Sequence, residues 1–239
     1  MGDEFSTPLT SPFYPKPPLH YIDAKLFLAL FNATEESLQK LLPDPLRPTD
    51  MGLTAMLHAY QPCKETGPFM ESALLIQCIY ENPDTGEEDV GLYFANAFAS
   101  TDVAIAVGRE VWGYPRKYAK ISMKWKDDTL VATTERGGEV LMRATCTFDD
   151  EGDWIDSGPN INLKLIPSAD ADGIDFAALT AAHVVYNVKN GRSGDVEIEF
   201  FKGGYDDLTL VEMVNPMIGL YFDTDITVPP AKIIKTLDL

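Results

Sequence analysis

The chain has 239 residues, 45% of them hydrophobic, and a formal net charge of −18 at pH 7. This length suits one large domain or two small ones, and the apolar content can support a core. The negative charge argues against nucleic acid and anionic membranes as partners, because binding phosphates needs clustered Lys and Arg side chains. No apolar run approaches the ~18 residues that span a bilayer, so we expect no membrane partner.

The cysteines and histidines follow no disulfide or ligand pattern. The cysteines are odd in number and widely spaced, and the histidines show no HExxH motif or paired spacing (Cys63, Cys78, Cys146, His20, His58 and His183). These spacings argue against a disulfide framework and a histidine-based zinc site. The N-terminal residues lack the charged-then-apolar layout of a signal peptide. We therefore expect a cytoplasmic protein.

Prolines and capping residues mark the first segments. Residues 1–20 contain five prolines, which favour an extended arm over a helix. Residues 32–46, NATEESLQKLLPDPL, predict a helix. Thr34 or Asn32 can cap it, acidic residues fill its first turn, and prolines end it.

From residue 52 onward, strand patterns dominate. Apolar runs bounded by Pro, Gly and Asp predict strands at 52–60, 72–81, 91–98, 121–125, 130–135, 139–148, 161–167, 182–188, 196–201 and 225–230. Residues 121–148 form an antiparallel meander. Its last strand shows clear alternation at Met142, Ala144, Cys146 and Phe148.

Helical patterns are few. Residues 168–179 or 208–217 give a weak helix pattern, and residues 102–111 form a second non-strand element. With no repeat and no linker, residues 1–239 are expected to form a single domain of the α+β, mostly β class. Because so many strands must avoid bare edges, we expect the sheet to curl, or to close into a barrel or cone, with a few flanking helices.

One basic stretch interrupts the acidic chain. GREVWGYPRKYAKI, residues 108–121, holds Arg109, Arg116, Lys117 and Lys120. A lysine attacks a carbonyl only as the free amine, and burial or a neighbouring cation lowers its pKa from the usual ~10.4. The resulting imine is an electron sink that lets a β-keto acid lose carbon dioxide. Taken alone, an Arg-Lys pair is more typical of a solvated surface turn.

The context of this stretch resembles the signature of the acetoacetate decarboxylase superfamily, in AIAVGRE (104–110) and WGYPRK (112–117). Further segments resemble the family in the same order along the chain: 6–15, 33–46, GPFMES (67–72), 161–167 and 225–234. The resemblance implies a curled, barrel-like or cone-like sheet around an apolar pocket. It also implies a homo-oligomer, no metal, no organic cofactor, and small oxo acids as substrates.

The sequence departs from the family at the reactive lysine. In the family's decarboxylases the residue directly after Tyr-Pro is the Schiff-base lysine, but here it is Arg116, and only Lys117 follows. Arginine keeps its proton, so Arg116 cannot be the amine nucleophile. Successive residues of an extended segment point to opposite sides, so the family's register places Arg116 in the pocket and Lys117 outside it. The family's substrate-binding arginine and one of its two pocket glutamates align with Ala24 and Leu53.

The remaining family glutamate matches Glu71, which predicts a pocket built on Arg116 and Glu71. A guanidinium binds a carboxylate or polarises an enolate oxygen, and a glutamate can transfer protons. The catalytic candidates are Arg116, Glu71 and, in a shifted register, Lys117; the substrate-binding candidates are Tyr114, His58, Phe69, Phe94 and Trp112. Structural roles remain as alternatives for these residues. Arg116 and Glu71 can form a buried ion pair, and Tyr114 and His58 can pack in the core.

Three functions are compatible with this pattern. The first is a divergent enzyme of lyase type that acts on an oxo acid or an enol, polyketide-like metabolite without a Schiff base. The second is a conventional β-keto acid decarboxylase with Lys117 as nucleophile. The third is a non-catalytic protein that binds a small molecule.

Overall fold

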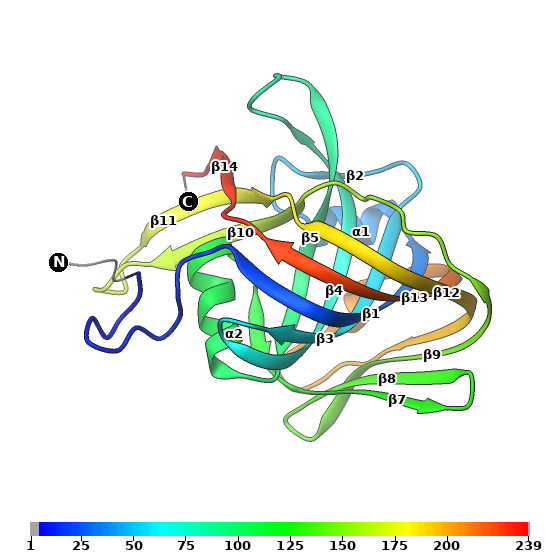
Figure 1. The fold of residues 1–239 in the computed structure, drawn as a ribbon. Coiled ribbons are helices and arrows are strands. Elements are labelled where there is room, and N and C mark those ends of the chain that lie inside the picture. Colours follow the sequence, from blue (N-terminus) through cyan, green and yellow to red (C-terminus); the bar gives the residue numbers. More distant parts are fainter. Residues whose placement is uncertain (1–4, 239) are drawn as a thin grey trace.

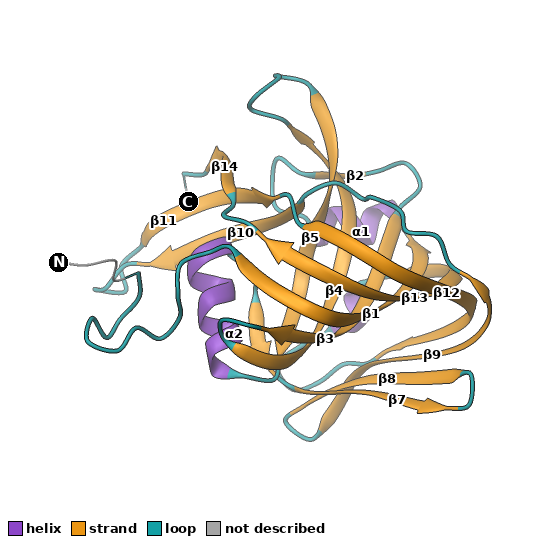
Figure 2. Ribbon diagram, in the orientation of Figure 1, coloured by secondary structure: helices purple, strands orange, loops and turns teal. Residues whose placement is uncertain are grey.

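The computed structural model describes residues 5–238 as a strand-rich fold with two short α-helices, in which one large sheet curls around the molecule (Figures 1 and 2). The strands are β1 (Leu19–Ala33), β2 (Arg47–Pro48), β3 (Leu53–Cys63), β4 (Gly67–Glu81), β5 (Glu88–Ala99), β6 (Arg116–Tyr118), β7 (Lys120–Lys126), β8 (Thr129–Arg136), β9 (Glu139–Glu151), β10 (Asn160–Pro167), β11 (Ile174–Ala182), β12 (Val185–Phe200), β13 (Met213–Val228) and β14 (Lys232–Thr236). The helices are α1 (Glu35–Leu41), α2 (Asp102–Val107), the π-helix η1 (Gly108–Trp112) and the 3-10 helix η2 (Leu208–Leu210). Within residues 5–238, no helix is long and apolar enough to cross a membrane.

The sheet is mixed, and it is curled but not closed. Its hydrogen-bonded order is β14-β11-β10-β5-β4-β3-β1-β13-β12-β9-β8-β7, with β2 paired to β4 and β6 paired to β5 beside this path. Most neighbours are antiparallel, whereas β10 and β6 both run parallel to β5. The expected α+β, mostly β fold is confirmed in its curled form, and the sheet keeps two end strands instead of closing on itself.

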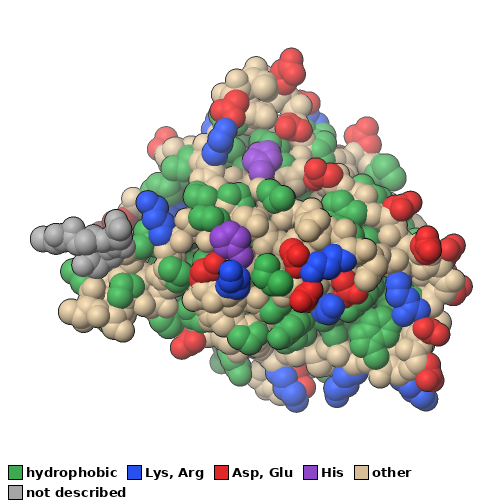
Figure 3. All heavy atoms as spheres, viewed as in Figure 1, with side chains coloured by type: hydrophobic (Ala, Val, Ile, Leu, Met, Phe, Trp, Pro, Cys, Tyr) green, Lys and Arg blue, Asp and Glu red, His purple; other side chains and the backbone are tan. Residues whose placement is uncertain are grey.

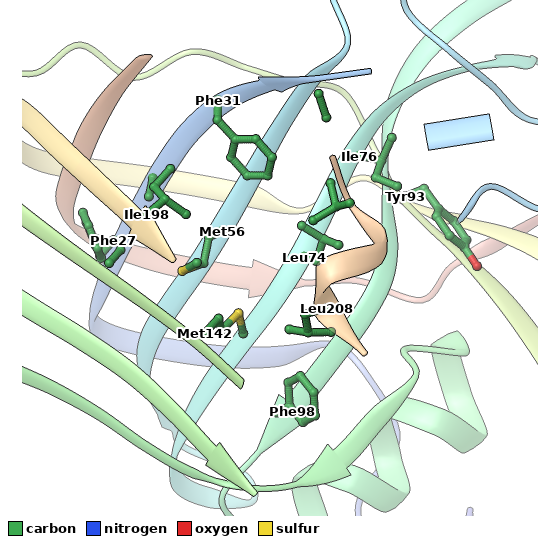
Figure 4. Packing of buried hydrophobic residues seen from close by; sticks show 14 of the residues in the cluster. Phe27, Phe31, Met56, Leu74, Ile76, Tyr93, Phe98, Met142, Ile198 and Leu208 are labelled. Carbon is green, nitrogen blue, oxygen red and sulfur yellow. The ribbon is translucent and has the colours of Figure 1, made fainter. Parts of the chain in front are cut away.

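The central strands bury both of their faces. Alternate residues of β1 enter different cores: Phe27 and Phe31 join one cluster, and Leu26 joins the other. The β7–β9 meander packs on the first cluster, which contains Met56, Leu74 and Met142 (Figure 4). The second cluster is covered by α2 and η1 and contains the candidate site. Two buried faces explain why the middle of the sheet is so apolar.

The predicted elements are confirmed where their local signals are strong. Helix α1 begins after Thr34, whose hydroxyl accepts a hydrogen bond from Ser37 N at 3.4 Å. The expected meander is β7, β8 and β9, and its alternating residues are all buried (Met142, Ala144, Cys146 and Phe148). The second non-strand element is α2 followed by η1.

One strand was not predicted from the sequence, and two expectations are wrong in their details. No strand was predicted at β1, because both faces of that strand are buried and its apolar residues show no period of two. Residues 168–179 do not form a helix, since β11 occupies most of that stretch and pairs with β10 and β14. The strand expected at 182–188 is divided between β11 and β12.

Part of the arm expected at 1–20 is irregular and contacts the helical segment. Residues 1–4 lie outside the described residues, residues 5–18 are irregular, and β1 begins at Leu19. Tyr14 is buried, and its hydroxyl donates a hydrogen bond to Glu110 of η1. The arm nevertheless exposes several large apolar side chains: Phe5, Leu9 and Phe13. Figure 3 shows other hydrophobic side chains exposed among charged ones on one face of the molecule.

These exposed apolar side chains motivate a prediction of self-association. Burying them against a second copy would remove apolar surface from water, which favours association. Light scattering at micromolar concentration is expected to give a multiple of the 26.4 kDa chain mass. A mass of one chain would contradict the prediction.

Candidate active site

The π-helix delivers Arg116 to the interior of the second cluster. Gly113 ends η1 with φ of 86°, and a Cβ there would lie 2.7 Å from Lys164 Cα, so only glycine fits. The chain then forms the short strand β6 beside β5, with Arg116 opposite Ala97 and Lys117 opposite Phe98. Ala97 belongs to the second cluster and Phe98 to the first. Arg116 and Lys117 therefore project to opposite faces of the sheet.

Arg116 and Glu71 form a buried ion pair. Their side chains are only 6% and 5% exposed. Arg116 Nη2 lies 2.6 Å from Glu71 Oε1, and Arg116 Nε donates to the same oxygen at 2.8 Å. Arg116 Nη1 donates to Ala104 O of α2 at 2.9 Å. Because a guanidinium has five N–H donors, these three bonds leave two for a further partner.

Aromatic rings and an amide complete the surroundings of the pair. The guanidinium carbon of Arg116 lies 4.9 Å from the ring centre of Tyr114 and 5.2 Å from that of Phe69. Gln61 Nε2 donates to Glu71 Oε2 at 3.3 Å. The amide oxygen of Gln61 is buried, and no donor among the described residues reaches it. The site therefore holds one acceptor that is free to meet a ligand hydroxyl.

The protonation of the pair and its neighbours follows from burial and charge. Burial by itself lowers the pKa of Arg116, but the attraction of Glu71, with help from Tyr21 and Tyr114, outweighs it and leaves that pKa raised. Burial raises the pKa of Tyr114 to about 12, against the hydrogen bond that its hydroxyl accepts from Asn160 at 2.9 Å. Burial likewise raises the pKa of Tyr21. At neutral pH the site thus holds a charged arginine and neutral phenols.

A cavity, here called the Arg116 cavity, lies beside the pair. Its volume is about 80 Å³, which is room for several waters or a small acid. Its walls come from β1, β3, β4, β5, η1, β6, β10, β12, β13 and the loop at 152–159, so it lies within the curl of the sheet. Its polar wall residues are Tyr21, Gln61, Glu71, Tyr114, Arg116, Ser157, Asn160 and Tyr186.

The structure brings most of the expected site residues together. Arg116, Glu71, Tyr114, Phe94 and Trp112 line the Arg116 cavity. Phe69 lies behind it and packs on the guanidinium. Ala24 is buried in the second cluster and Leu53 lines a neighbouring cavity, so neither position supplies a charge to the site.

Lys117 lies on the other side of the sheet, as its place after Arg116 predicts. Its side chain is 38% exposed, and its amine pairs with the buried carboxylate of Asp206. Arg136 Nη1 holds the other oxygen of Asp206 at 2.8 Å. These contacts tie β6 and β8 to the β12–β13 connection and place the Lys117 amine away from the Arg116 cavity.

His58 was expected to bind substrate, and its position contradicts that expectation. It alternates with Leu57 and Ala59 along β3 and so faces the first cluster, away from the Arg116 cavity. Its Nε2 lies 3.0 Å from Thr134 Oγ1, and Thr134 donates to Ser72 at 2.7 Å. Burial lowers the pKa of His58 to about 3, so it is a neutral core residue.

Several wall residues were not predicted from the sequence. Gln61 could have been found, because it shares the parity of Leu57 and Ala59 on β3 and so faces the same side as Glu71 on β4. The sequence gives no comparable signal for Asn160 and Tyr186. They reach the cavity wall only because β10 and β12 lie near the other wall strands in the folded sheet. The loop at 152–159, with Trp154, likewise reaches the site only through the tertiary fold.

Comparison with known proteins identifies the family. A family model described as acetoacetate decarboxylase (ADC) matches residues 6–237, and the chain belongs to this family. Acetoacetate decarboxylase of Bordetella avium is 30% identical over 175 residues, which are 71% of this chain and 69% of that protein. Acetoacetate decarboxylase of Clostridium acetobutylicum is 26% identical over 242 residues, 97% and 95% of the two chains. The chain is accordingly an enzyme of the decarboxylase or lyase type, as its sequence suggested.

Solved structures agree on the fold. A solved acetoacetate decarboxylase superposes with a TM-score of 0.86 at 25% identity and covers 98% of this chain and 96% of its own. The enduracididine biosynthesis enzyme MppR in complex with pyruvate superposes with a TM-score of 0.85 at 17% identity, over 98% and 99% of the two chains. At that identity the second likeness concerns the fold alone.

Gly108 provides a test of the position of Arg116. A Cβ at Gly108 would lie 2.7 Å from Arg116 Cδ and 2.8 Å from its Nη1. Gly108 has helical φ and ψ, so alanine is otherwise acceptable there and favoured by about 1 kcal/mol. Gly108→Ala is therefore expected to displace the guanidinium and weaken carboxylate binding at least tenfold by calorimetry. Unchanged carboxylate binding in a folded variant would show that this binding does not depend on the position of Arg116.

Proposed function

We propose that this enzyme acts on an oxo acid or its enol without forming an imine, and that Arg116 and Glu71 carry the chemistry. The observation that supports this most is the place of Arg116 in the cavity wall beside Glu71, while the Lys117 amine is bound to Asp206 on the opposite face. Arginine keeps its proton and cannot attack a carbonyl, so a nucleophilic amine is missing from the described cavity wall.

The free N–H groups of Arg116 suit an anionic oxygen. A guanidinium in a cavity with apolar walls holds a carboxylate, or an enolate oxygen as charge develops on it, more strongly than it would in water. Decarboxylation of a β-keto acid then breaks the bond to the carboxyl carbon and moves the electron pair toward the ketone oxygen. Carbon dioxide leaves, and the enolate carbon takes a proton. Arg116 stabilises the charge on oxygen, and Glu71, its ion-pair partner, transfers the proton in this proposal.

A neighbouring amide supports the binding of an enol. Gln61 Nε2 donates to Glu71 Oε2 at 3.3 Å, and no donor among the described residues reaches the Gln61 amide oxygen. That oxygen can accept a hydrogen bond from an enol hydroxyl in the cavity.

Paired variants of Arg116 and Lys117 test the assignment. Arg116→Gln is expected to lower turnover of oxo acids by about 100- to 1,000-fold, the usual cost of losing a donor to a developing oxyanion. Lys117→Gln is expected to change turnover by less than about threefold, because Arg136 still neutralises Asp206. A steady-state assay with a panel of oxo acids gives both values.

Folding needs its own control in this test, since Arg116→Gln leaves the buried Glu71 carboxylate without its cation. The double variant Arg116→Gln with Glu71→Gln restores a neutral, hydrogen-bonded contact and is expected to recover thermal stability but not turnover. Loss of turnover in Lys117→Gln, with Arg116→Gln active, would reverse the assignment.

A further inference from the structure

A second cavity adjoins the Arg116 cavity, and we call it the distal chamber. Its volume is about 100 Å³. The two cavities share part of their walls, formed by Leu28, Leu75, Leu92, Trp154, Ile155 and Ser157. They are thus neighbouring compartments of one interior region.

The strand register sets the two cavities in a line. On β1, Leu26 lines only the Arg116 cavity, Leu28 lines both, and Leu30 lines only the distal chamber. On β4, Glu71 belongs to the first cavity and Leu75 to both. Alternate residues of a strand share a face and each residue advances about 3.3 Å, so Leu75 lies about 13 Å along the strand from Glu71. An extended ligand held at Arg116 can therefore reach the chamber by lying along these strands.

The distal chamber is apolar where the tail would lie. The walls that belong to it alone include Leu30, Leu53, Ala55, Leu220 and Phe222. Three of its polar wall residues have partners in the protein: Thr54 Oγ1 donates to Gly52 O, Gln77 Oε1 accepts from Thr49, and Asp156 Oδ1 accepts from Gly158 N. The other polar wall residue, Ser157, lies at the boundary that the two cavities share.

Trp154 lies at the junction of the two cavities. Its ring centre is 4.4 Å from that of Tyr186, which lines the Arg116 cavity, and 5.1 Å from that of Phe222, which lines the distal chamber. The ring joins the two walls and presents an apolar surface to both sides. A ligand that extends from one cavity to the other passes along Trp154.

We propose that the distal chamber is a subsite for the apolar tail of the substrate, whose acid or enol end is held at Arg116. The substrate is accordingly an oxo acid with an alkyl or aryl tail longer than the methyl group of acetoacetate. This inference rests on the proposed function in placing the acid end at Arg116. Filling an apolar void with methylene groups removes them from water and restores contacts that the wall side chains lack.

A series of unreactive straight-chain carboxylates tests the proposal. Acetate, butanoate, hexanoate and octanoate are titrated into the wild-type protein by calorimetry. Affinity is expected to rise by about fourfold for each added methylene until the chamber is full, and then to level off. Affinity that does not change with chain length would overturn the proposal.

Filling the chamber from the protein side provides the control. Ala55→Phe and, independently, Leu30→Phe are expected to abolish the advantage of octanoate over butanoate and to change butanoate binding by less than about twofold. Retained butanoate binding shows that the variant is folded and that its Arg116 end is intact. An advantage of octanoate that persists in both variants would place the tail elsewhere and overturn the proposal.

These measurements test the proposed subsite independently of the proposed reaction. Binding is measured without turnover, so a chain-length effect removed by Ala55→Phe supports the subsite even if no oxo acid is converted. Conversion of short oxo acids with no chain-length effect supports the proposed reaction and rejects the subsite. Arg116→Gln with Glu71→Gln is expected to weaken short and long carboxylates by the same factor, because it removes only the end that they share.

Discussion

The buried pair of Arg116 and Glu71 is the constraint on which the site depends. Two opposite charges that are almost fully shielded from water can remain there only if they face each other and have further hydrogen bonds. The surroundings meet this demand: Ala104 O accepts from Arg116, Gln61 donates to Glu71, and Gly108 leaves room for the guanidinium. Strands β4 and β6 meet across β5 so that these groups come together.

The same pair separates this chain from the lysine chemistry that its family resemblance implies. The chain keeps the family's fold over nearly its whole length, and the departure that excludes an imine is the side chain directly after Tyr114-Pro115. A neutral lysine can form a bond to a carbonyl carbon, whereas a guanidinium can only donate hydrogen bonds and charge. The proposed chemistry therefore uses electrostatic stabilisation by Arg116 and proton transfer by Glu71.

Much of this arrangement could be predicted from local patterns. The Thr34 cap, the β7–β9 meander and the opposite directions of Arg116 and Lys117 follow from capping, alternation and family register. Other features depend on contacts between distant segments. His58 faces the first cluster because its neighbour Ala59 lies opposite Glu71, and successive residues of a strand project to opposite faces of the sheet. Trp154 and Asn160 reach the cavity only because the sheet curls, which no short stretch of sequence records.

A search for a covalent adduct tests the imine-free chemistry most directly. The wild-type protein and Arg116→Lys are each incubated with acetoacetate, reduced with borohydride, and examined by mass spectrometry with peptide mapping. We expect no added mass on the wild-type protein, because its cavity wall offers a guanidinium and no amine, and an adduct at position 116 in the variant. An adduct on Lys117 of the wild-type protein would contradict the imine-free chemistry and make Lys117 the nucleophile.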